Sequence, residues 1–112
     1  MAKAYWIGRI DVHNPDGYRH YAAANPAIIK KFGGRFVVRS GKFEGVEGQS
    51  RTHNVVIEFP DCETATACYR SPEYQENIKR RTPHSTAELV IIEGYGGSQP
   101  QSAALHAGLP AS

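Results

Sequence analysis

The sequence predicts an α+β fold of the ferredoxin-like type, in which a βαββαβ chain lays two helices on one face of a four-stranded antiparallel sheet. Two observations lead to this prediction. Segments with the two-residue alternation of strands and segments with the three-to-four-residue spacing of helices follow one another in the order strand, helix, strand, strand, helix, strand. The length of 112 residues is enough for one domain and too short for two.

The first predicted strand covers residues 4–12, where apolar side chains recur at alternate positions. Because strand side chains alternate between faces, Trp6 should lie on one face of the sheet and Tyr5 on the other. Asn14 and Pro15 then predict the start of a helix, since an asparagine side chain can cap the first turn and a proline suits its first position.

The first predicted helix carries one stripe of mainly apolar side chains at helical spacing. Pro26 lies inside this stripe and lacks an N–H group, so a kink or a break is expected there. Gly33 can adopt the left-handed conformation that ends a helix. The stripe consists of Tyr18, Tyr21, Ala22, Asn25, Ile28, Ile29 and Phe32.

The stretch KFGGRFVVRSG predicts a helix end followed at once by a second strand, at residues 35–40. Strict alternation would place Phe36 and Val38 on the helix-covered face and Val37 and Arg39 on the opposite face. The opposite face then carries charged and apolar side chains together.

The rest of the domain follows from the same two periodicities. The glycine-rich residues 41–52 predict a long connection to a third strand at residues 53–59. Asp61 is expected to cap a second helix, and Pro72 to restart that helix as a new segment. Residues 88–95 predict a fourth strand, apolar on both faces, whose phase the pattern does not fix.

The predicted domain covers residues 1–95, and residues 96–112 are expected to form a flexible tail. The tail contains no Lys, Arg, Asp or Glu and many Gly, Ser, Ala and Pro residues. On one helix, Cys62 and Cys68 would be about 9 Å apart along the axis, too far for a disulfide. Two reduced thiols predict a cytoplasmic protein.

Charge and motifs argue against several classes of partner. Thirteen basic and eleven acidic residues give a net charge of +2, which predicts no binding to nucleic acid. No apolar stretch has the length of a membrane span, so no membrane partner is expected. The five histidines and two cysteines form no metal-binding motif, and neither a metal nor a cofactor is predicted.

The face of the sheet opposite the helices carries too many apolar side chains to meet water comfortably. A second copy of the chain could cover it with the same face, which predicts a homodimer. The charged side chains would then line an enclosed space between two sheets, where a small-molecule ligand could bind.

Several segments resemble the bacterial family known as domain of unknown function 1330: KFGGRFVVRSG, VEG, NVVIEFPDCETATACYRSPEYQ and ELVIIEG. The resemblance implies a dimeric α+β barrel, a superfamily that includes cofactor-free monooxygenases, lactone isomerases and haem enzymes, and it implies no agreed activity for the family. One departure is visible, because the family often has a tryptophan and a proline where this chain has Ser50 and Thr52. The matching positions are Gly33, Gly34, Arg39, Glu47, Gly48, Glu58, Phe59, Ser71, Pro72, Tyr74 and Arg81.

Arg39 and Glu58 are the candidate catalytic pair, because strand alternation places them on adjacent strands and on the same face. Arg39 could hold a carboxylate or a developing oxyanion, and Glu58 could accept a proton. The alternative is an ion pair that only fixes the dimer interface. The candidate ligand-binding residues are Tyr5, Arg9, Asn54, Tyr74 and Arg81.

The sequence therefore predicts a small homodimeric protein that binds a small organic molecule, anionic or carbonyl-bearing, in the barrel between protomers. It leaves open whether the protein is a cofactor-independent enzyme or a non-catalytic binding or structural dimer. Haem use would need an axial ligand, and His53, the candidate nearest the sheet, is expected on the helix-covered side.

Overall fold

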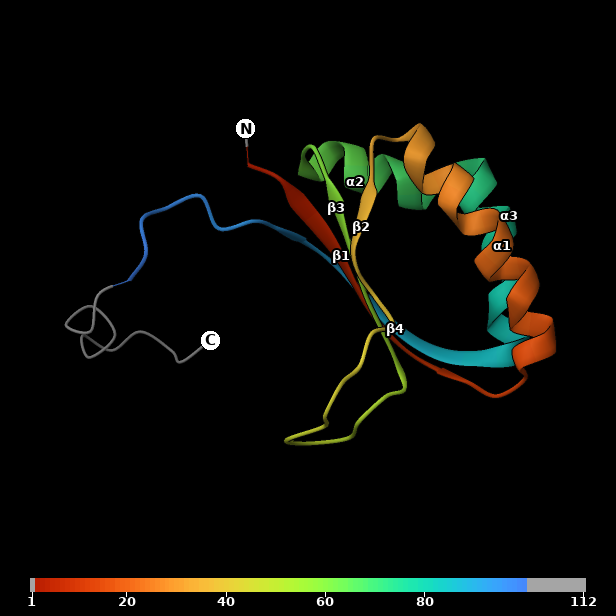
Figure 1. Ribbon diagram of the computed structural model, residues 1–112. Helices are drawn as coiled ribbons and strands as arrows, with labels where there is room; N and C mark the ends of the chain where they lie inside the picture. The colour runs from red at the N-terminus through yellow and green to blue at the C-terminus, as the bar shows by residue number, and fades with distance from the viewer. Residues whose placement is uncertain (1, 101–112) are drawn as a thin grey trace.

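The computed structural model describes residues 2–100 and has the predicted ferredoxin-like α+β fold (Figure 1). The four strands form one antiparallel sheet in the order β2-β3-β1-β4. The elements in chain order are β1 (Ala4–Val12), α1 (Pro15–Lys31), β2 (Arg35–Arg39), β3 (His53–Phe59), α2 (Cys62–Arg70), α3 (Pro72–Arg81), the short 3₁₀ helix η1 (Thr82–His84) and β4 (Ser85–Glu93).

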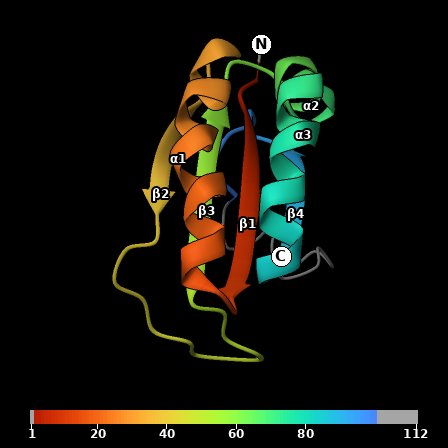
Figure 2. The same cartoon turned by 90° about the vertical axis from the view of Figure 1, so that its right-hand side faces the viewer.

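The helices form one layer and the sheet forms the other. Figure 2 shows α1 on one side and α2 and α3 on the other, all in front of the same face of the sheet. We call this covered side the helix face and the opposite side the open face. Any site between the layers is therefore built from the inward sides of α1 and α3 and from alternate residues of the strands.

The end of α1 follows the prediction and its start differs in detail. Gly33 has a φ of 77°, and the N–H groups of Gly33 and Gly34 donate to the carbonyls of Lys30 and Ile29, a Schellman arrangement. The Asn14 side chain makes no capping bond and instead contacts the His84 ring, 3.2 Å from Nδ2 to Nδ1.

A kink or a break was predicted at Pro26, and the break is wrong, because α1 continues through this residue. A proline inside a helix removes one backbone hydrogen bond, and this leaves the carbonyl of Ala22 without its usual N–H partner. The apolar stripe keeps its phase across Pro26, with Tyr21 and Ile29 both buried. Burial on both sides of the proline holds the helix together.

The second helical region is divided as predicted. The Asp61 carboxylate caps α2 by accepting from the N–H of Thr64 (2.7 Å). Ser71 ends α2 and caps α3, because its Oγ accepts from the N–H of Tyr74 (3.2 Å) and donates to the carbonyl of Cys68 (2.7 Å). These two hydrogen bonds of Ser71 fix the start of α3, and with it the position of Arg81 relative to the sheet.

The fourth strand begins and ends earlier than predicted, at Ser85–Glu93 rather than 88–95. Its pairing with β1 fixes the phase that the sequence leaves open: Leu89 pairs with Gly8, on the helix face. Val90 and Ile92 therefore lie on the open face, where they are 53% and 51% exposed.

The second strand contains a bulge that strict alternation does not predict. Phe36 pairs with Ile57 on the helix face, but the next pair in the ladder joins Val38, not Val37, to Val56. A bulge inserts one residue on one strand, so every side chain beyond it changes face. The prediction that Val38 lies on the helix face is therefore wrong.

The bulge also moves Arg39. It pairs with Val55 on the helix face, and its guanidinium lies over the ring of Phe36, 4.8 Å from the ring centre. Arg39 was predicted on the open face beside Glu58, so that placement is wrong. The two side chains lie on opposite faces of the sheet.

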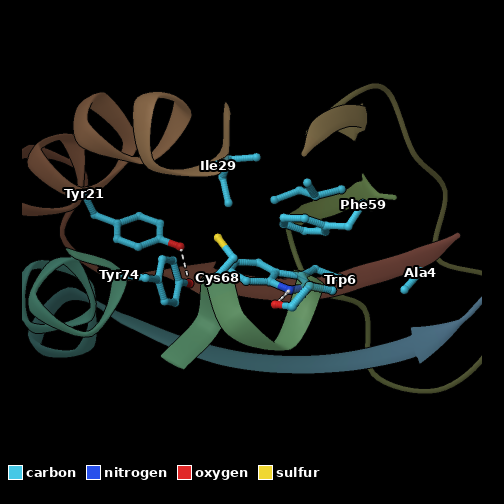
Figure 3. Packing of buried hydrophobic residues seen from close by; sticks show 9 residues of the cluster. Ala4, Trp6, Tyr21, Ile29, Phe59, Cys68 and Tyr74 are labelled. Atoms are coloured by element: carbon cyan, nitrogen blue, oxygen red, sulfur yellow. Dashed lines mark hydrogen bonds between the residues drawn. The ribbon is translucent and has the colours of Figure 1, made fainter. Parts of the chain in front are cut away.

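The core lies between the helices and the sheet and is centred on Trp6 (Figure 3). The Trp6 side chain is 2% exposed, and its Nε1 donates to the carbonyl of Ala65 on α2 (3.0 Å). Its ring centre lies 5.2, 5.9 and 4.9 Å from those of Phe59, Tyr69 and Tyr74. One indole therefore joins the central strand to both helices that follow β3.

Residues 94–100, which continue from β4, have no helix or strand. Most of the predicted tail, residues 101–112, lies outside the described residues. Both cysteines are free thiols, as predicted: Cys62 is exposed and Cys68 is buried in the core. Among the described residues, no helix is long and apolar enough to span a bilayer.

Candidate functional site

A cavity of about 640 Å³ lies between the helix layer and the helix face of the sheet. This volume is within the range of small-molecule binding sites. The cavity is bounded by side chains of β1, α1, β2, β3, α3 and β4. The main lining residues are Trp6, Gly8, Ile10, Tyr18, Tyr21, Ala22, Asn25, Phe36, Arg39, His53, Val55, Ile57, Tyr74, Arg81 and Leu89.

Arg81, the last residue of α3, lines this cavity from the helix side. It is 8% exposed, and its Nε has no hydrogen-bond partner among the described residues. Its guanidinium lies over the ring of Tyr21, 5.4 Å from the ring centre. No carboxylate of the described residues lies within 4.0 Å of it. Burying a cation without an acid costs free energy, so this side chain favours an anionic neighbour in the cavity.

Asn25 faces the same cavity from α1. It is 7% exposed, and its Oδ1 also lacks a hydrogen-bond partner among the described residues. An unsatisfied buried polar atom costs about 1–3 kcal/mol. Within residues 2–100, the side chains that line the cavity thus include one with an unpaired acceptor, on α1, and one with an unpaired donor, on α3.

Two buried tyrosines join α1 to α3 beside these atoms. The hydroxyls of Tyr21 and Tyr74 are 2.7 Å apart, as the dashed line in Figure 3 shows. Burial raises the pKa of Tyr21 well above its ordinary value, and burial also raises the pKa of Tyr74. Both phenols therefore remain protonated at neutral pH. Since one hydroxyl donates to the other, the pair has one further O–H to offer a ligand.

Three less buried residues line the same cavity. Tyr18 packs edge-on to the His53 ring, 5.9 Å between ring centres, and Arg39 is exposed. Burial raises the pKa of Tyr18, while the positive charges of Arg81 and Arg39 act in the opposite direction. The positive charges of both guanidinium groups therefore oppose the effect of burial on the pKa of Tyr18. The imidazole of His53, on the helix face as predicted, is the type of side chain that most often serves as a general base.

The structure divides the residues predicted for the site into two groups. Arg39, Tyr74 and Arg81 line the helix-face cavity, and Arg81 is buried. The other predicted residues do not line it. They are Tyr5, Arg9, Asn54 and Glu58, all on the open face.

Glu58 is held by three donors on the open face. Its carboxylate accepts from Tyr5 Oη (3.1 Å), Arg35 Nε (3.1 Å) and Lys3 Nζ (3.3 Å). The hydrogen bond from Arg35 is the main cause that lowers the pKa of Glu58, and the bonds from Tyr5 and Lys3 add to it. A carboxylate so fully bonded is a weak proton acceptor. It ties β1, β2 and β3 together instead.

This depressed pKa predicts a specific acid sensitivity. A carboxylate with a lowered pKa in the folded state stabilises the protein above its unfolded-state pKa, 4.5, and this contribution disappears as pH falls through the lower folded-state value. We expect Glu58→Gln to be less stable than the wild type at neutral pH, with the difference shrinking below about pH 4.5. Urea unfolding at a series of pH values measures this. An equal difference at all pH values would contradict it, and Glu63→Gln on the exposed side of α2 is the control.

Arg9 and Asn54 lie beside a smaller hollow of about 300 Å³ beneath the β2–β3 connection. Each donates a hydrogen bond to a backbone carbonyl of the connection: Arg9 to the carbonyl of Gln49 (2.8 Å), and Asn54 Nδ2 to the carbonyl of Arg51 (3.2 Å). Arg51 in turn contacts the carboxylate of Asp11 (2.7 Å). These polar groups have protein partners, so they position the connection.

Metal binding has no built site among residues 2–100, and the buried thiol of Cys68 is not a candidate nucleophile. No three His, Cys, Asp or Glu side chains in this part of the chain come together as metal ligands. Burial raises the pKa of the Cys68 thiol to about 12, which suits a core residue and not a nucleophile. The residues do not provide an arrangement that would hold a metal.

Asn25 and Tyr21 line the cavity but were not predicted from the sequence as candidate site residues. Both were assigned to the buried stripe of α1, which is correct, but neither was considered as a binding group. The available signal was an amide side chain in the phase of buried apolar residues, one position before Pro26.

The comparison with protein families matches the chain to one family. The model described as domain of unknown function (DUF1330) matches residues 3–95. The chain belongs to this family. The family resemblance predicted from the sequence is therefore confirmed. None of the curated proteins compared with the chain matches it.

Solved structures share the fold of this DUF1330 protein at low sequence identity. A protein of unknown function from Rhodopseudomonas palustris is 19% identical, with 86% of this chain and 85% of that chain covered and a TM-score of 0.66. SnoaB, a cofactor-independent oxygenase from Streptomyces nogalater, is 14% identical, with 91% and 99% covered and a TM-score of 0.62. A dimeric protein of unknown function with a ferredoxin-like fold from Bacteroides fragilis is 12% identical, with 84% and 98% covered and a TM-score of 0.58.

Proposed function

We propose that this protein binds a small organic molecule with an anionic or carbonyl oxygen in the helix-face cavity. The observation that carries the proposal is Arg81, a buried cation that lines the cavity and whose Nε has no partner in the part of the chain that the structure describes. A ligand oxygen that accepts from Nε would restore a hydrogen bond and balance the charge. The sequence predicted a ligand between protomers on the open face, whereas this cavity lies on the helix face of the sheet.

The same groups could act in catalysis without a cofactor. Arg81 and the spare hydroxyl of the Tyr21–Tyr74 pair are donors that could stabilise negative charge developing on a carbonyl oxygen. His53 could exchange a proton with the ligand. SnoaB, described as a cofactor-independent oxygenase, has this fold, which supports the scaffold as a host for such chemistry.

Filling the cavity tests the proposal. Gly8 lies on the cavity wall, and a Cβ built on it makes only ordinary contacts, with Leu89 Cδ1 at 3.5 Å and Ile10 Cδ1 at 3.9 Å. A methionine there would extend into the space that the ligand needs. We expect Gly8→Met to fold and to lose at least about 90% of the binding signal of small carboxylates and ketones in ligand-observed NMR, since sites that lose shape complementarity lose most of their contacts.

The matched control is Gly41→Met. Gly41 has no atom within 4 Å of a built Cβ, so the same side chain is added to open space. Ligands that bind the wild type and Gly41→Met but not Gly8→Met would support the cavity. Undiminished binding to a folded Gly8→Met protein would place the ligand elsewhere and contradict the proposal.

A second function is favoured by a separate observation on the open face. Apolar side chains of all four strands form a strip on this face, exposed except for the half-buried Val56, and such a strip is typical of a protein interface. A second copy of the chain is the occupant that we propose, because a self-complementary face can close a dimer. The dimeric fold relative from B. fragilis supports this proposal. The strip consists of Ile7, Val37, Val38, Val56, Val90 and Ile92.

The alternative to a ligand-binding protein is a structural dimer without ligand or catalysis. In that case the hydrogen bonds that Glu58 accepts serve only to hold together the strands that form the interface. The alternative predicts that no small molecule discriminates between wild type and Gly8→Met. The cavity experiment therefore separates the two functions.

A further inference from the structure

The two unpaired atoms of the cavity wall differ in what they require from a ligand. Asn25 Oδ1 is an acceptor and needs an O–H or N–H group. Arg81 Nε carries a proton and needs an acceptor. Both side chains are more than nine-tenths buried, at 7% and 8% exposed. One ligand that offers a donor and an acceptor would satisfy both atoms at once.

The charge around the cavity favours an anionic ligand group as the acceptor for Arg81. Two acidic residues touch the cavity boundary, and each has a basic partner: Asp16 lies 3.7 Å from Arg19, and Glu88 lies 3.4 Å from Arg51. Among residues 2–100, Arg81 has no such partner. The uncompensated charge of the buried wall is positive, so the acceptor that suits it best is a carboxylate.

Six of the side chains that line the cavity carry aromatic rings. Aromatic walls favour a planar ring as ligand, because offset and edge-to-face contacts stabilise ring pairs beyond the area they bury. The rings that line the cavity are Trp6, Tyr18, Tyr21, Phe36, His53 and Tyr74.

We propose that the ligand class of this cavity is the aromatic hydroxy acids. The ligand carboxylate accepts from the Arg81 guanidinium, its hydroxyl donates to Asn25 Oδ1, and its ring lies against the aromatic wall. This inference rests on the proposed function, since it names the ligand class of the same cavity. It adds a second recognition group, the amide of α1, and a requirement for a hydroxyl.

The position of Asn25 supports a role in recognition. Pro26 follows it and removes the helical partner of the Ala22 carbonyl, so this turn of α1 is already short of one hydrogen bond. Ala22 and Asn25 both line the cavity. A second unsatisfied acceptor in the same turn adds to the cost of an empty site. A ligand hydroxyl relieves that cost.

The test compares binding of benzoate with binding of its ortho, meta and para hydroxy derivatives to the full chain by isothermal titration calorimetry. The three isomers are needed because the ligand hydroxyl must reach Asn25 while the carboxylate stays on Arg81. We expect one isomer to bind at least about tenfold more tightly than benzoate, the gain typical of a hydrogen bond that satisfies a buried group. Phenol and cyclohexanecarboxylate should bind more weakly than that isomer, because each lacks one recognised feature.

Two variants assign the gain to the two side chains. Asn25→Leu keeps the branched shape of the side chain and removes the acceptor, so it should abolish the preference for the hydroxy isomer over benzoate. Arg81→Met should weaken all the carboxylates by about a hundredfold, the effect expected for a charge-assisted bond, and leave phenol unchanged. Arg81→Lys keeps the charge and should recover part of the loss. The ligand series on the wild type decides the question if a variant does not fold.

The outcomes distinguish this inference from the proposed function. If no hydroxy isomer exceeds benzoate, or if Asn25→Leu keeps the preference, the assignment of aromatic hydroxy acids is wrong. If these acids fail but neutral ketones bind the wild type and not Gly8→Met, the ligand class fails and the cavity function stands. If no probe distinguishes the wild type from Gly8→Met, both proposals are wrong.

Discussion

Replacing Trp6 by alanine is expected to lower the free energy of unfolding by about 4 kcal/mol, the range seen when a large buried aromatic side chain is removed. Trp6 is 2% exposed and contacts Phe59, Tyr69 and Tyr74. The substitution would open a void in the centre of the core. It would also leave the carbonyl of Ala65 without the bond from the indole N–H (3.0 Å).

Urea denaturation followed by circular dichroism measures this loss. Tyr95→Ala is the control, because Tyr95 is 68% exposed and its removal should change stability by no more than about 0.5 kcal/mol. A loss below about 2 kcal/mol for Trp6→Ala would mean that the helices pack on the sheet without depending on the indole. The core described above would then be wrong at its centre.

Most of the fold could be predicted because it depends on local periodicity. The alternation of β1 and β3, the Schellman end of α1 at Gly33 and the restart of the helix at Pro72 all follow from residue types within a few positions. The phase of β4 could not be predicted, since both of its faces are apolar. The pairing of Leu89 with Gly8 decides it, and that pairing is a tertiary contact.

The candidate site was predicted less well than the fold, and a single residue explains much of the difference. Alternation assigns faces correctly as far as Phe36, and the bulge at Val37 then reverses the assignment of Val38 and Arg39. Nothing in a run of two valines distinguishes a bulge from a regular strand. The predicted Arg39–Glu58 pair depended on strict alternation of side chains between Phe36 and Arg39.

The cavity itself is a consequence of how far the helix layer lies from the sheet, which no local pattern contains. Arg81, a ligand-binding candidate from the family resemblance, lines the cavity, but its burial could not be predicted. A basic residue at the end of a helix is usually solvated. Its position results from Ser71, which sets the start of α3, and from Asn77, which binds the carbonyl of Tyr21 on α1 (3.3 Å).

The size of the open face bears on the proposed dimer. Four strands spaced about 5 Å apart and about 25 Å long give roughly 500 Å² of sheet, less than the roughly 800 Å² that each partner buries in a standard interface. The β2–β3 connection is the nearest source of further apolar area. Phe43 and Val46 on it are 49% and 79% exposed. A dimer on this face should therefore bury the connection as well as the strands.

An aspartate in the middle of the open face should separate the protomers. Val90 is 53% exposed and lies opposite Ile7, within the apolar strip. A dimer would bury the new carboxylate without a basic partner, which costs several kcal/mol, and the twofold symmetry would bury it twice. We expect Val90→Asp to raise the dimer dissociation constant by at least about a thousandfold, measured by sedimentation equilibrium.

The control for charge is Ala67→Asp, which adds the same group on an exposed position of α2, away from the open face. It should leave the dissociation constant within about threefold, since surface charges interact weakly. A folded Val90→Asp protein that remains dimeric would mean that the protomers meet through another surface. A wild type that is monomeric at about 100 μM, a concentration far above the dissociation constants of standard interfaces, would mean that the apolar strip serves a different partner.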